Sequence, residues 1–225
     1  MSGEVRLLGL AHGLVLGLVL ACPLVAPDLL PWGIDALLLV GGFQLRLADR
    51  RFTLRPGIWG WFSHIRMAPT RLFRWGAAAL AAMIVGHGAL AVAILLAALA
   101  CELLAYPIVT WLLDARSLSV ATAALVLLIT AVGLPGATAL HLVACFLTGV
   151  VGCMVWLRGP DGEPRALAIA LGGGVAATAT SLCFPGALPF AAPIVIVCAA
   201  WILAHLSMLR RQLLPWRLDI APVRP

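Results

Sequence analysis

The sequence predicts an all-α protein, a polytopic bundle of about eight transmembrane helices in one membrane domain covering residues 1–225. Hydrophobic residues make up 63% of the chain and charged residues only 11%, whereas about a quarter of a soluble domain is charged. The mean hydropathy is +1.09. A chain this apolar cannot cover its surface with polar side chains, so lipid has to be its solvent.

The first apolar run, about 6–26, follows an arginine and could be taken for a signal peptide. Leu24 stands where a cleavage site would need a small residue, so we interpret the run as a retained helix. A later apolar run, 76–113, is too long for one crossing and is divided at Gly86, His87 and Gly88. The predicted spans after the first are about 31–47, 73–86, 88–113, 117–133, 136–157, 166–183 and 189–209.

The longest polar stretch, 48–75, lies between the second and third predicted spans and mixes arginines with aromatic residues. Trp59, Trp61, Phe62 and Arg66 represent this mixture. Long basic and aromatic side chains suit the headgroup layer, where one end is apolar and the other is wet. We expect this segment to lie along the cytoplasmic surface and to contact lipid headgroups or a partner.

The basic residues predict the orientation. All 15 are arginine, and with eight spans every one of them falls on the same side of the membrane. One span fewer or more would divide them between the two sides. The positive-inside rule therefore places both termini in the cytoplasm of a bacterial-type inner membrane. The positive charge does not indicate nucleic-acid binding, because no recognition motif accompanies it.

The first predicted span carries small residues at four-residue spacing: Gly9, Gly13, Gly17 and Ala21. This spacing places them along one helix face, where another backbone can approach closely. We predict close helix packing through this face. The alternative is chance, because glycine is common in membrane helices.

Glu102 is the one acidic residue well inside a predicted span, and Tyr106 follows it by one helical turn. Burying an ionisable group in hydrocarbon costs free energy unless the group is neutral, paired or hydrated. One interpretation is a proton or cation site. The other is a neutral acid, hydrogen-bonded across helices to a hydroxyl or a backbone carbonyl. The sequence leaves both open.

Asp28, Asp35, His87 and His141 all fall near the outer ends of predicted spans. They could form a metal or proton-entry site, but they lack metal-type ligand spacing, and solvation in turns is the simpler interpretation. We therefore predict no metal site and no cofactor. His12 and His205 lie near the cytoplasmic boundary, and we expect their polar tips to reach water.

No sequence motif identifies a reaction, since the chain has no P-loop, GxSxG, HExxH or dinucleotide fingerprint. We predict no catalytic residue and favour a non-catalytic membrane subunit or assembly factor, acting through helix contacts with partner membrane proteins or with itself. The alternative is a small-solute or ion permease that uses Glu102. An integral membrane enzyme acting on lipid comes third. A continuous polar path through the interior would favour transport.

Overall fold

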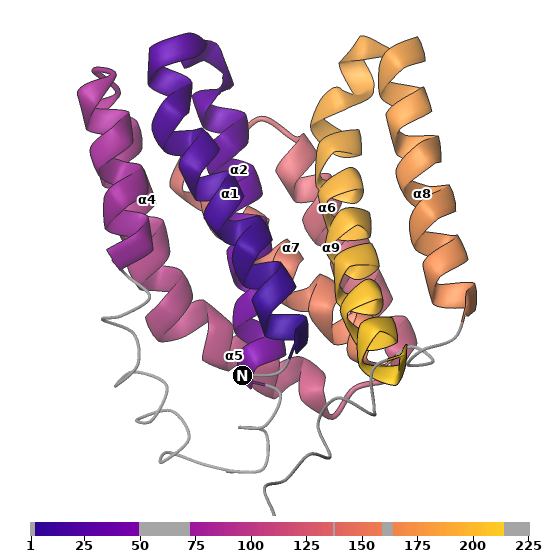
Figure 1. Cartoon of the computed structure of the whole chain (residues 1–225). Helices are drawn as coiled ribbons and strands as arrows, with labels where there is room; N and C mark the ends of the chain where they lie inside the picture. The colour runs from indigo at the N-terminus through magenta and orange to yellow at the C-terminus, as the bar shows by residue number, and fades with distance from the viewer. Residues whose placement is uncertain (1–2, 50–72, 137, 159–163, 214–225) are drawn as a thin grey trace, which may run out of the picture.

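The computed structural model describes residues 3–49, 73–136, 138–158 and 164–213, and they are helical with no strand among them (Figure 1). The all-α prediction is therefore confirmed for this part of the chain. The predicted interfacial residues Trp59, Trp61, Phe62 and Arg66 lie outside the described residues.

The helices begin and end at the proline, glycine and polar residues that separate the apolar runs. At the turn before α4, Gly86 has φ +84°, a backbone conformation that favours glycine. Within the described residues, the 3₁₀ turns η1 (Pro27–Leu29) and η4 (Pro185–Ala187) and the π-helical turn η3 (Cys101–Ala105) join helices. The helices are α1 (Gly3–Val25), α2 (Leu30–Asp49), an apolar helix over Phe73–Ile84, α4 (Gly88–Ala100), α5 (Tyr106–Asp114), α6 (Leu118–Gly133), α7 (Thr138–Arg158), α8 (Pro164–Cys183) and α9 (Leu188–Leu213).

Among the described residues, four helices are long and apolar enough to cross a membrane: Gly88–Asp114, Thr138–Arg158, Arg165–Cys183 and Pro185–Leu206. Shorter apolar helices cover Gly9–Ala21, Phe73–Ile84 and Leu118–Gly133. A membrane location is supported by these lengths and compositions. The first of the four is the continuous rod formed by α4, η3 and α5.

Consecutive helices run up and down, so α1 begins and α9 ends at the same end of the bundle (Figure 1). The described arginines near helix ends belong to that end: Arg46 lies in the last turn of α2, Arg158 in the last turn of α7, and Arg165 at the start of α8. The turns α1–α2, α6–α7 and α8–α9 lie at the opposite end (Figure 1). We call these the arginine end and the arginine-free end.

Among the helix pairs whose contacts the structure describes, α2 and α7 form the most extensive interface, and glycine brings their backbones together there. A Cβ on Gly42 would collide with the backbone carbonyl of Phe146, and a Cβ on Gly149 with that of Leu39. Close approach of this kind allows many van der Waals contacts. These contacts drive helix association in a membrane, because lipid is as apolar as the side chains and the hydrophobic effect does not favour their burial there. The α2–α7 pair is therefore the centre of the bundle.

The small-residue face of α1 does not take part in this packing. A Cβ on Gly13 or Gly17 would meet nothing within 4 Å, and Ala21 is exposed. A Cβ on Gly9 would only make an ordinary contact with Gln44. The prediction of close packing through this face is thus wrong within the described chain, and it stays a prediction for contact with another chain. The helix instead buries Val19, against Gly33 of α2.

Candidate functional site

Near the arginine-free end, three ionisable side chains from α2 and α7 meet. The imidazole Nε2 of His141 lies 2.9 Å from Asp35 Oδ2 and 3.6 Å from Cys145 Sγ. His141 and Asp35 are partly exposed, at 27% and 22% of their side-chain surface, whereas Cys145 is buried. We call Asp35, His141 and Cys145 the outer triad.

Deeper in the bundle, Glu102 lies in the π-helical turn η3 and is 2% exposed. A π turn inserts one extra residue into a helix, which changes the direction of the side chains around it. Such turns are frequent at functional sites, because they distort a helix where a side chain has to be aimed. Ala98, one turn before Glu102, is also buried.

Closer to the arginine end, two further polar side chains, Tyr106 and Arg46, bond to acidic residues on a neighbouring helix. The Tyr106 hydroxyl donates a hydrogen bond to Asp49 Oδ2 at 2.9 Å, so it joins α5 to the end of α2. Arg46, with 7% of its side chain exposed, forms an ion pair with Asp114 at 3.0 Å. The sequence had suggested Tyr106 as a hydroxyl beside Glu102, and the structure instead pairs it with an acid on another helix.

Arg158, in the last turn of α7, caps the C-terminal end of α5. Its guanidinium donates hydrogen bonds to the backbone carbonyls of Leu113 and Asp114. The last carbonyls of a helix have no partner within the helix and carry a partial negative charge, so an arginine there satisfies and stabilises them. The ends of α2, α5 and α7 are thereby held together by charged hydrogen bonds.

Several of these groups are buried inside the bundle, whereas the Asp114 side chain is half exposed. Cys101, Tyr106 and Cys145 lie in the same core cluster, which contains residues of α2, α4, α5 and α7. Glu102 is adjacent to Cys101 and equally buried. From the arginine-free end to the arginine end, α2, α7 and the α4–η3–α5 rod carry the outer triad, Glu102, Tyr106 with Asp49, and Arg46 with Asp114.

The other candidate residues are placed differently. Asp28 and His87 are exposed in turns and do not join Asp35 and His141, in agreement with solvation as the simpler interpretation. The expectation that His12 and His205 reach water is wrong, because they are 2% and 4% exposed. His12 packs beside Trp75, with ring centroids 6.0 Å apart.

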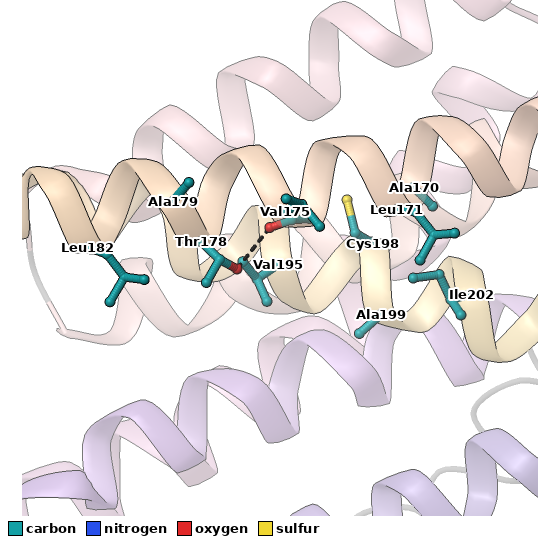
Figure 2. Close-up of a pocket in the computed structure, with 11 residues that line it drawn as sticks. Ala170, Leu171, Val175, Thr178, Ala179, Leu182, Val195, Cys198, Ala199 and Ile202 are labelled. Atoms are coloured by element: carbon teal, nitrogen blue, oxygen red, sulfur yellow. Dashed lines mark hydrogen bonds between the residues drawn. The ribbon is translucent and has the colours of Figure 1, made fainter.

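An open groove of about 450 Å³ lies between α8 and α9 (Figure 2). Its hydroxyl group, on Thr178, is already bonded to the Gly174 carbonyl at 2.8 Å, as the dashed line in Figure 2 shows. The groove is therefore apolar and suits an acyl chain or a helix better than a polar substrate. The lining residues are Ala170, Leu171, Gly174, Val175, Thr178, Ala179, Leu182, Val195, Cys198, Ala199 and Ile202.

Sequence reasoning missed Cys145. One signal was present: His141 and Cys145 are four residues apart, which places them on the same helix face one turn apart. Nothing in the sequence pairs either of them with Asp35, which is 106 residues from His141. Comparison of the chain with protein-family models, curated proteins and solved structures finds no match.

Proposed function

We propose that this chain is a membrane permease for a proton or small cation, and that the ion passes along the interface of α2, α7 and the α4–η3–α5 rod. The observation that supports it most is that α2, α7 and this rod carry ionisable side chains at the outer triad, at the buried Glu102 and at the Tyr106–Asp49 pair. Ionisable side chains are rare inside membranes and usually mark ion or proton pathways. The sequence alone favours a non-catalytic subunit, because besides Glu102 it offers few polar groups inside the predicted spans.

The shape of the rod that carries Glu102 adds support. It is interrupted by a π turn at the acid, and Pro107 follows directly in the first turn of α5. Proline supplies no N–H to the turn before it. Interrupted helices are common at the ion sites of transporters, because they expose backbone groups and redirect side chains. In the proposed mechanism the Glu102 carboxyl takes up and releases the ion.

The proposal includes a topology. Eight spans with the arginine end in the cytoplasm of a bacterial-type inner membrane would satisfy the positive-inside rule. Asp35 and His141 would then lie near the outer surface, and the Tyr106–Asp49 and Arg46–Asp114 pairs near the inner one.

Glu102→Gln tests the function. The amide keeps the size of the acid and its ability to hydrogen-bond, but it cannot carry a proton or bind a cation as a carboxylate does. In proteoliposomes with an internal pH dye, we expect the wild type to pass protons down an imposed gradient, and Glu102→Gln to fold normally and lose this flux. Asp28→Asn is the matched control, because Asp28 is an exposed acid in a turn and its loss should leave flux unchanged. If Glu102→Gln retains wild-type flux, Glu102 is a structural acid and the permease proposal fails.

A membrane subunit or assembly factor is the second candidate, supported by the uncovered face of α1. A Cβ on Gly13 or Gly17 would meet nothing within 4 Å, so a helix of another chain could approach there. Gly13→Leu should then abolish copurification with a partner, or self-association, in mild detergent. Gly172→Leu, at an equally open glycine on α8, is the control. Equal association of the two variants would indicate that the α1 face only meets lipid.

A further inference from the structure

The outer triad combines three different metal-ligand types from two helices. A carboxylate oxygen of Asp35, an imidazole nitrogen of His141 and the thiol sulfur of Cys145 all lie within 4.8 Å of one another. Two of the three spacings are 2.9 Å and 3.6 Å. Tetrahedral zinc bonds of about 2.0–2.3 Å hold neighbouring ligand atoms roughly 3.3–3.6 Å apart, so the His141–Cys145 spacing fits as it stands and the His141–Asp35 spacing has to widen by roughly 0.4 Å.

The charges of the three ligands also suit a divalent ion. A metal-bound cysteine is a thiolate, so its proton is released to water on binding. The Asp35 carboxylate and the Cys145 thiolate would then supply two negative charges, and a neutral His141 none. A divalent cation makes this set neutral overall, and neutrality matters where low dielectric penalises net charge. A thiolate and an imidazole select borderline or soft transition ions, since magnesium and calcium prefer oxygen.

We propose that the outer triad is a binding site for a divalent transition-metal ion of the zinc and cobalt type. The fourth position is left for water, as in zinc sites with three protein ligands. Partial exposure of His141 and Asp35 gives the ion a route from the arginine-free end, while α2 and α7 hold the ligands on the most extensive interface of the bundle. The role of the triad as the entry site for a transported ion rests on the proposed permease function. Its role as a metal-binding site does not.

The test uses the full-length protein in mild detergent, without a polyhistidine tag, titrated with Co²⁺. We expect about one Co²⁺ per chain, with a thiolate-to-cobalt charge-transfer band that Zn²⁺ abolishes and Mg²⁺ does not. Cys145→Ser should remove the band, and Asp35→Asn should weaken binding at least about tenfold. Cys183→Ser is the control, because Cys183 is an exposed free thiol on α8 and its loss should leave the band intact.

A folded wild-type protein without the cobalt band overturns the inference, and so does a band that survives in Cys145→Ser. If Cys145→Ser does not fold, Asp35→Asn decides: wild-type affinity in that variant overturns the site, and a loss of at least about tenfold supports it. Glu102→Gln separates the two proposals. It should bind Co²⁺ as the wild type does even where it carries no flux, so each proposal can fail without the other.

Discussion

Gly149→Ala probes the α2–α7 contact on which the outer triad depends. The added methyl carbon would lie 2.8 Å from the Leu39 carbonyl carbon and 2.9 Å from the Phe43 nitrogen, and closer still to the Leu39 oxygen. Carbon atoms make their best contact at about 3.5–4.0 Å, so the helices have to separate by roughly 0.7 Å or more. Backbone atoms cannot rotate out of the way as a flexible side chain can.

A gap of this size gives up roughly a quarter to a half of the dispersion energy at the contact. Overpacking of a tight core costs about 1–3 kcal/mol, and we expect the upper end here because only backbone is available to move. Alanine regains up to about 1 kcal/mol through its higher helix propensity. The net loss should be about 2 kcal/mol, which lowers the melting temperature of a chain of this size by about 4–8 °C.

Thermal unfolding in detergent, followed by tryptophan fluorescence, measures this difference. Gly17→Ala is the matched control, because its new Cβ meets nothing within 4 Å and the same gain in helix propensity applies. It should melt at or slightly above the wild-type temperature. If Gly149→Ala melts as high as Gly17→Ala, the backbones of α2 and α7 are not in contact and the reasoning is refuted.

Other predictions concern the two ends of the bundle. Tyr106→Phe removes the hydrogen bond to Asp49 and should lower stability by about 1 kcal/mol, or about 2–4 °C in melting temperature; an unchanged melting curve would contradict this. Reporter fusions at Gly136 and Gly186 should report the periplasm and a fusion at Gly162 the cytoplasm, because the arginines lie at the opposite end from the first two; any reversed report rejects the topology. Denaturant should be needed before a maleimide labels Cys101 or Cys153, both 0% exposed, and labelling of the folded protein at either residue would show that the core opens.

Where the helices lie follows from the sequence with little ambiguity. The predicted divisions at Gly86 and His87 and near Pro135 coincide with breaks between helices. Local chemistry explains this agreement: glycine permits a positive φ, and proline disfavours a helical conformation in the residue before it. Neither effect depends on what the segment packs against.

The packing face of α1 could not be predicted in the same way. Its residues are apolar on nearly every side, so periodicity does not distinguish an inward face from an outward one. Glycine spacing suggested Gly13 and Gly17, but the closest backbone contact between α2 and α7 uses Gly42 and Gly149. A glycine permits a close approach without requiring one, and only the neighbouring helix decides whether it occurs.

The sequence by itself determined the class of protein, because a solvent of lipid demands an apolar surface and satisfied backbone groups. It also singled out Glu102, since an acidic residue inside a long apolar run stands out from the sequence alone. Only the tertiary structure decided which ionisable residues on different helices pair with one another. The pairing of Asp35 with His141 and of Asp49 with Tyr106 joins residues 106 and 57 positions apart, and such contacts are set by how α2 lies against α7 and α5. No local preference encodes that arrangement, because it results from the packing of whole helices against one another.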